Sequence, residues 1–129
     1  MKTKGTVTGI VSNLVTVKVD GPVSENEICY ILSQGVKMMA EVIKVNGDSA
    51  QVQVFESTRG MKGGDTVEFE GKMLEVTLGP GLLSSTYDGL QNNLATMENV
   101  FLQRGEYTDP LDHSKKWEFT PIAKPQDKV

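Results

Sequence analysis

The first part of the chain alternates apolar and polar residues with the period of two that half-buried β-strands show. Val7 and Val11 share one parity, and the valines of residues 15–19 continue it after a Ser12-Asn13 turn. Asp20-Gly21-Pro22 then interrupts the pattern, as turn residues do at the end of a strand. The pattern predicts two short strands joined by the Ser12-Asn13 turn.

A hairpin is predicted over residues 36–45 and 48–55, with Asn46-Gly47 between the two strands. Asparagine followed by glycine tolerates positive φ at both central positions, which gives the tight turn whose twist matches antiparallel strands. The apolar residues of the second strand fall on one face: Ala50, Val52 and Val54. We therefore expect that face to point into a core.

Further short strands, separated by turn residues, are predicted after the first two. An apolar run covers residues 28–32, a loop with three glycines covers 57–65, and 66–70 and 73–78 form a last predicted pair around Gly71. Six or seven short strands with turns every 8–12 residues are typical of a small barrel. The sequence thus predicts a mainly β fold: a closed antiparallel β-barrel over residues 1–78, in which closure removes exposed strand edges.

The pattern changes after residue 78. Pro80 suits the first position of a helix, and one helical stripe is formed by Leu83, Tyr87, Leu90 and Leu94. Residues 79–100 are therefore predicted to be a connector with a short helix. Residues 101–129 form an irregular, partly disordered segment in which Trp117 and Phe119 are candidate anchors, and we expect residues after about 95 to be poorly packed.

The composition argues against several classes of function. The 129 residues carry a formal net charge of −4, which argues against a nucleic-acid or anionic-membrane surface. No apolar run reaches the roughly 18 residues of a membrane span, and the first residues lack the apolar segment of a secretory signal. The single cysteine, Cys29, allows no intrachain disulfide, and we interpret it as a small buried hydrophobe of a reduced, cytoplasmic protein.

Two glycine-rich stretches could in principle hold phosphate. The loop STRGMKGGD at 57–65 lacks the Gly-Lys-Ser/Thr ending of a Walker A loop, and Gly71-Lys72 lacks the first glycine. The GPG at 79–81 matches only the start of a dinucleotide fingerprint and follows no βαβ unit. We interpret the first stretch as turn-forming and the second as a stiff connector.

Other candidate chemistry is sparse. His113 lies 84 positions from Cys29, so a zinc site is not expected, and His113 is interpreted as part of a solvated polar loop. Glu68 and Glu70 occupy alternate strand positions and are predicted to share one solvent face. The sequence therefore predicts no catalytic, cofactor-binding or metal-binding residue in this chain.

Eight segments stand in a fixed order along the chain: EVI 41–43, NG 46–47, VQVFESTRGM 52–61, GD 64–65, LGPGLL 78–83, YDGLQ 87–91, FLQRG 101–105 and KKWEFTP 115–121. This ordered set resembles the alpha chain, the catalytic A-type subunit, of V-type and archaeal-type ATPases and ATP synthases. The resemblance covers nearly the whole sequence. One departure is Asn92-Asn93, which stands where the family usually has Arg-Pro.

The resemblance implies an N-terminal structural and assembly domain, followed by a connector and by the start of the protruding insertion called the bulge or non-homologous region. In that family the barrel contacts neighbouring B subunits in a ring, with no nucleic acid and no direct membrane contact. ATP and Mg would bind in a part of the full-length alpha chain that has no counterpart among these residues. The intact cytoplasmic, peripheral protein would couple ATP hydrolysis or synthesis to proton or sodium transport, and this chain alone would not be an enzyme.

Two alternatives remain open at this stage. Small antiparallel barrels also bind oligonucleotides or proteins as free-standing OB-like modules, although the acidic balance and the few aromatic residues count against nucleic acid. A small independent enzyme would need a constellation of reactive residues that the sequence does not present.

Overall fold

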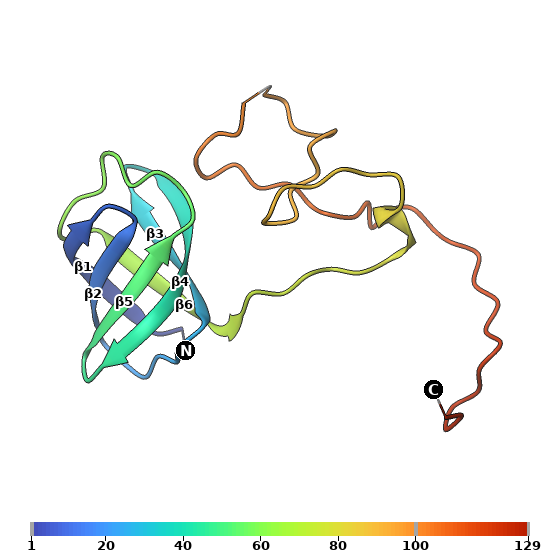
Figure 1. Cartoon of the computed structure of the whole chain (residues 1–129), viewed down its shortest axis with the longest axis horizontal. Coiled ribbons are helices and arrows are strands. Elements are labelled where there is room, and N and C mark those ends of the chain that lie inside the picture. The colour runs from blue at the N-terminus through green and yellow to red at the C-terminus, as the bar shows by residue number, and fades with distance from the viewer. Residues whose placement is uncertain (1, 100, 129) are drawn as a thin grey trace. The chain divides into compact units, whose positions relative to one another are not determined.

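A computed structural model describes residues 2–99 and 101–128 and contains a closed antiparallel barrel in the strand order β1-β2-β5-β4-β3-β6 (Figure 1). The strands are β1 (Lys4–Val11), β2 (Leu14–Val19), β3 (Glu27–Ser33), β4 (Val36–Asn46), β5 (Ser49–Val54) and β6 (Thr66–Met73). The ring closes because β6 pairs with both β1 and β3. The predicted mainly β, closed-barrel fold is confirmed.

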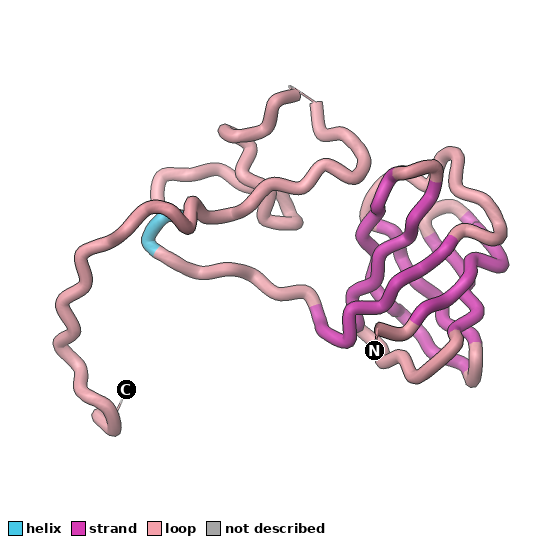
Figure 2. The backbone as a smooth tube through the Cα atoms, turned by 180° about the vertical axis from the view of Figure 1, so that it is seen from behind, coloured by secondary structure: helices cyan, strands magenta, loops and turns pink. Residues whose placement is uncertain are grey.

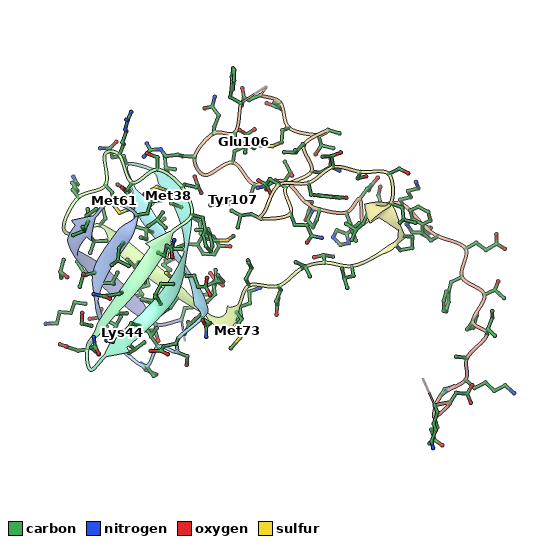
Figure 3. All side chains as sticks on the ribbon, viewed as in Figure 1. Met38, Lys44, Met61, Met73, Glu106 and Tyr107 are labelled. Carbon is green, nitrogen blue, oxygen red and sulfur yellow. The ribbon has the colours of Figure 1, made fainter. Side chains whose placement is uncertain are left out.

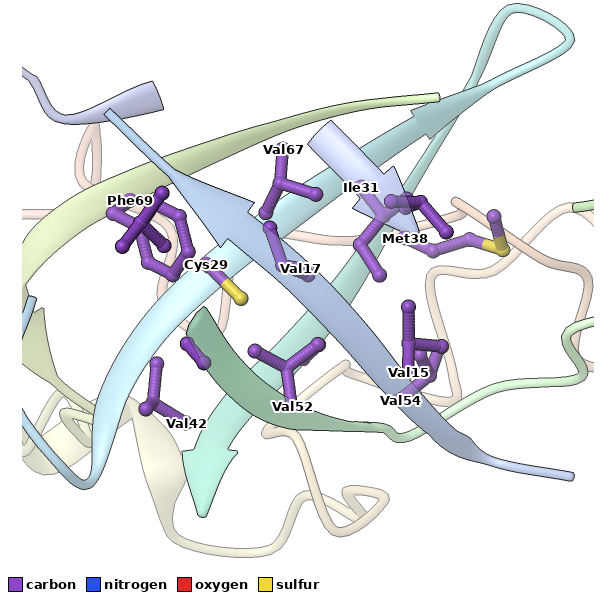
Figure 4. Packing of buried hydrophobic residues seen from close by; sticks show 14 residues of the cluster. Val15, Val17, Cys29, Ile31, Met38, Val42, Val52, Val54, Val67 and Phe69 are labelled. Atoms are coloured by element: carbon purple, nitrogen blue, oxygen red, sulfur yellow. The ribbon is translucent and has the colours of Figure 1, made fainter. Parts of the chain in front are cut away.

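The barrel interior is filled by small branched side chains around one aromatic ring (Figure 4). The fully buried members are Val7, Val15, Val17, Cys29, Ile31, Met38, Val42, Val52, Val54, Val67 and Phe69. Each such side chain contributes roughly 1.5–3 kcal/mol relative to exposure. The predicted inward face of β5 is confirmed, since Ala50, Val52 and Val54 are all at most 1% exposed.

The predicted β4–β5 hairpin is confirmed, but its turn lies one residue later than expected. Asn46 ends β4 and pairs with Ser49, so Gly47 and Asp48 are the central residues, and of the Asn46-Gly47 pair only Gly47 has a positive φ, 59°. Only a residue that tolerates positive φ fits there without strain.

Val11 does not share the inward parity of Val7, and that part of the sequence interpretation was wrong. The pairing of β1 with β2 shifts register between Val7 and Gly9, which marks a β-bulge. A bulge adds one residue to one strand and so reverses the faces beyond it. Val7 is 2% exposed and Val11 is 74% exposed.

The expected strand pair around Gly71 is a single strand. β6 runs through Gly71, which has a φ of 71°, and ends at Met73. The backbone N–H of Gly71 donates to the buried carboxylate of Glu27 at 2.6 Å, beside a register shift between Glu27 and Cys29 on β3. A positive φ with a carboxylate partner therefore bends the strand where the sequence predicted a turn.

The predicted helical stripe from Leu83 to Leu94 does not form a helix. Among the residues described, the helical element is the 3-10 turn η1 (Pro80–Leu82), seen as the short cyan segment in Figure 2. Ser84 and Gln91 both have a φ of 63°, outside the helical region. Tyr87 and Asn93 instead form an isolated antiparallel bridge, so this stretch folds back on itself as a loop.

The chain divides into two compact units. The first contains the barrel, through Glu75, together with Asn99–Tyr107, and the second contains Val76–Glu98 together with the residues from Thr108 onward. The expectation that residues after about 95 pack poorly was wrong for Gly105 and Tyr107, because both make hydrogen bonds to the barrel.

Candidate functional site

The glycine-rich loop at 57–65 is a set of tight turns fixed to β1. The Asp65 carboxylate, 7% exposed, accepts from the Lys62 N–H at 2.9 Å, and the Gly64 N–H donates to the Val7 carbonyl at 2.8 Å. Val7 in turn donates its N–H to the Asp65 carbonyl. These amides are engaged within the barrel, so the turn-forming interpretation is confirmed.

The GPG stretch begins the 3-10 turn with Pro80 at its first position. Leu111 lies against both flanking glycines: a Cβ at Gly79 or at Gly81 would lie 3.0 Å from a Leu111 methyl. A larger residue at either position would require the Leu111 side chain to shift. This contact supports the interpretation of the stretch as a connector rather than a phosphate loop.

The loop after this connector is organised by the Asp88 carboxylate. One oxygen accepts from the N–H groups of Leu90 and Asn92, and the other accepts from the Asn92 side-chain amide at 2.8 Å. Partial burial alone would raise the pKa of Asp88, but the hydrogen bonds from Asn92 and Leu90 hold its pKa below the usual value. The Gln91 side-chain amide pairs with both backbone groups of Thr77, at 2.8 and 2.7 Å.

Asn92 is 4% exposed and links two parts of the second unit. Its side-chain oxygen accepts from the Thr108 N–H at 2.8 Å, and the neighbouring Asn93 N–H donates to the Thr108 hydroxyl at 2.7 Å. The Asn92-Asn93 pair thus provides the hydrogen bonds that join these two stretches.

A cavity of about 660 Å³ opens at the end of the barrel near Glu27. Glu27 is 6% exposed, and its two oxygens accept from the N–H groups of Ser24 and Gly71. A second carboxylate at the cavity, Glu70, is paired with Lys2 at 2.7 Å. These two carboxylates are thus committed to contacts within the fold, and a third at the cavity, Glu25, is exposed.

The outer face of the barrel carries an apolar patch at the Ser12-Asn13 turn, composed of Val11, Leu14 and Phe55. Val11 and Leu14 are cross-strand partners, Leu14 pairs with Gln53 of β5, and Phe55 follows directly after the end of that strand. The three side chains are 74%, 39% and 37% exposed. This outward apolar group is a candidate contact surface.

Sequence reasoning missed one polar cluster on the barrel rim, formed by Glu56, Arg104 and Tyr107. Figure 3 labels Tyr107 in the segment that returns to the barrel. Glu56 and Tyr107 lie 51 residues apart and are joined by a hydrogen bond from the tyrosine hydroxyl to the carboxylate. No periodicity within one element could reveal such a pair, although the charged and aromatic residue types were visible.

The expected solvent face of Glu68 and Glu70 is confirmed by their partial exposure and their ion pairs with Lys4 and Lys2. His113 is exposed, in agreement with the predicted polar loop. In the ranges 2–99 and 101–128, no group of three or more His, Cys, Asp or Glu residues is placed to hold a metal ion. No helix in the described part of the chain is long and apolar enough to cross a membrane.

Cys29 is fully buried, as predicted, and burial raises the pKa of its thiol to about 12. We expect no reaction with a chromogenic disulfide reagent at pH 8 in the native protein, and one thiol per chain after unfolding. Between pH 9 and 12 the unfolded thiol ionises while the native thiol keeps its proton, so this group should lower stability as pH rises. Rapid native labelling would contradict the burial.

Comparison of the sequence with known proteins identifies the family of this chain. The profile of the "ATP synthase alpha/beta family, beta-barrel domain" matches residues 7–71, which is half of the chain. A V-type ATP synthase alpha chain of Borrelia garinii subsp. bavariensis is 51% identical over 132 residues, covering 100% of this chain and 23% of the relative. A V-type ATP synthase alpha chain of Treponema denticola is 50% identical over 129 residues, covering 98% of this chain and 22% of the relative.

A third relative, the V-type ATP synthase alpha chain of Borreliella afzelii, is 49% identical over 132 residues and shows the same coverage of 100% and 23%. The chain therefore spans less than a quarter of the length of the curated relatives it matches. The profile match covers β2 to β5 entirely and most of β1 and β6. With this match over a closed six-stranded barrel, the chain belongs to the ATP synthase alpha/beta family, whose β-barrel domain it contains.

Proposed function

We propose that this chain supplies the structural and assembly barrel of the catalytic alpha chain of a rotary V-type ATP synthase. The observation that carries this proposal is the identity of about half of all positions, over the whole chain, to V-type ATP synthase alpha chains. The intact alpha chain would couple ATP hydrolysis or synthesis to proton or sodium transport. It would work as a peripheral, cytoplasmic part of a membrane-bound complex.

The glycine-rich loop and the paired carboxylates of Glu27 and Glu70 do not form a site for ATP and Mg. The glycine-rich loop directs its amides to β1 and to Asp65, and the carboxylates of Glu27 and Glu70 are already paired within the fold. A nucleotide–metal site needs free backbone amides, a lysine and an available carboxylate in one place. We therefore assign phosphoryl transfer to other parts of the intact alpha chain, and these residues alone to a non-catalytic role.

The contact with a neighbouring B subunit is assigned to outward side chains. All six strands are paired on both sides in the closed barrel. Their backbone hydrogen-bonding groups are therefore satisfied within the domain, and a partner would contact side chains. Within the barrel, Val11, Leu14 and Phe55 form an exposed apolar group whose burial in a contact would be favourable. We assign this patch to the barrel of an adjacent B subunit.

The test measures binding of the 129-residue chain to the purified B subunit by titration calorimetry. Leu14→Asp places a charge in the patch and should weaken binding at least about tenfold. Ile43→Asp is the matched control, because Ile43 is 44% exposed on β4 outside the patch and should bind as the unaltered chain does. Equal weakening by both variants would contradict the assignment of the patch.

Two further outcomes would overturn the broader proposal. Micromolar binding of ATP by this chain would mean that the nucleotide-binding site lies within these residues. Salt-dependent retention on single-stranded DNA would favour the OB-like alternative, in which affinity falls steeply with salt concentration.

A further inference from the structure

We infer that residues 104–107 form a releasable clasp on the barrel rim, where the Glu56 carboxylate and neighbouring backbone carbonyls bind the Arg-Gly-Glu-Tyr segment of the same chain. This inference concerns an internal binding site and does not depend on the proposed ring contact. It follows from contacts that connect residues 45 to 68 positions apart in the sequence.

Glu56 engages the clasp with both carboxylate oxygens. One accepts from the Gly105 N–H at 2.7 Å, and the other accepts from the Tyr107 hydroxyl. The same hydroxyl accepts from the Met39 N–H at 2.9 Å. Tyr107 therefore joins a carboxylate to a β4 amide next to Ala40, where the ladder with β5 ends. Burial, followed by the bond to Glu56, raises the pKa of Tyr107, so the hydroxyl remains a donor at neutral pH.

Arg104 holds the other end of the clasp. Its guanidinium donates to the carbonyl of Ser57 at 3.2 Å and to the carbonyl of Arg59. A guanidinium presents several N–H donors in a fixed plane, which suits two backbone carbonyls of one turn. The loop at 57–65 thus has a role beyond joining two strands, because its carbonyls form part of the receptor.

Gly105 lets the clasp approach the barrel closely. A Cβ at this position would lie 2.8 Å from Val36 Cγ1 and 3.1 Å from the Lys37 carbonyl oxygen, and the residue has a φ of 72°. Any other residue would be both crowded and strained. The close approach of the clasp to Val36 and Lys37 therefore depends on glycine at position 105.

The clasp should open without unfolding the barrel. It is held mainly by a few hydrogen bonds from Arg104, Gly105 and Tyr107, and its apolar neighbours are largely exposed: Phe101 by 81% and Leu102 by 62%. Segments with few buried apolar contacts open locally at low free-energy cost. The barrel core, by contrast, is held by side chains that are almost fully buried.

The test uses hydrogen exchange of the whole 129-residue chain. Tyr107→Phe removes the acceptor of the Met39 N–H, and Glu56→Gln removes the charged acceptor of the Gly105 N–H. We expect the Met39 and Gly105 amides to exchange about ten- to a hundredfold faster in both variants. Glu68→Gln, which removes a carboxylate from the outer face of the barrel, is the control and should leave both amides unchanged.

Amides in the centre of β5 report whether the barrel itself has loosened, and they should exchange at the unaltered rate in every variant. Cleavage after Arg104 by an arginine-specific protease is a second readout, and it should accelerate by a similar factor in the two clasp variants only. Unchanged exchange at Met39 in both clasp variants would overturn the inference. Equal acceleration in the centre of β5 would overturn it as well, because the segment would then be part of the core and not a clasp.

Discussion

Replacing Phe69 by alanine should lower the free energy of unfolding of the barrel by about 3–5 kcal/mol. Phe69 is 1% exposed and is the largest of the fully buried side chains. Its neighbours in the barrel are mostly valines with a stiff β-branched shape, so they cannot move far enough to fill the space. The substitution removes transfer free energy and leaves a cavity, and both effects add to the loss.

Urea unfolding followed by circular dichroism measures this loss for the whole chain. Phe119→Ala is the matched control, because the same atoms are removed from a side chain that is 82% exposed. That variant should stay within about 0.5 kcal/mol of the unaltered chain. Similar losses for the two variants would show that Phe69 is not the centre of the core.

The fold of the barrel was predictable because its core depends on a simple physical rule. A strand buried on one face must place apolar residues at every second position, and Val15, Val17, Val52 and Val54 do so. The hairpin was also visible from Gly47, which accepts the positive φ of the turn, although the turn itself lies one residue later than the Asn46-Gly47 pair suggested. Closure was inferred from the number and spacing of short strands.

The errors arose where one residue changes the geometry of a neighbouring stretch. The bulge after Val7 reverses the faces of β1, and apolar spacing alone cannot locate a bulge. Between Leu83 and Leu94 the apolar residues keep a helical spacing, but the Asp88 carboxylate captures the backbone amides of Leu90 and Asn92. Aspartate and asparagine compete in this way with helix formation, and the helical stripe was therefore misleading.

The candidate site was harder to predict than the fold, for a related reason. The apolar patch depends on the reversed face of Val11, and the clasp joins Glu56 to Tyr107, 51 residues further along the chain. Neither feature has a local pattern. Family resemblance identified the segment that includes Gly105 as characteristic, but the reason for this glycine became clear only from its contact with Val36.

The other large effect is expected from adding one methyl group at Gly5, near the start of β1. A Cβ there would lie 2.6 Å from Val17 Cγ1 and 2.8 Å from the Lys18 carbonyl oxygen, with Phe69 at 3.2 Å. A backbone carbonyl cannot move aside without disturbing the pairing of β1 with β2. Gly5→Ala should therefore destabilise the barrel by about 1–3 kcal/mol, as overpacking of a filled core does.

Gly9→Ala is the control that separates this crowding from the general effect of replacing glycine. Gly9 lies in the same strand, and a Cβ there would meet only Thr16, at an ordinary contact distance of 3.7 Å. Alanine at such a site reduces the entropy of the unfolded chain and should stabilise by about 0.4–1 kcal/mol. Thermal unfolding of the two variants should thus shift in opposite directions. A shift in the same direction would mean that Gly5 is kept for its backbone freedom and not for the space that Val17 and Lys18 leave.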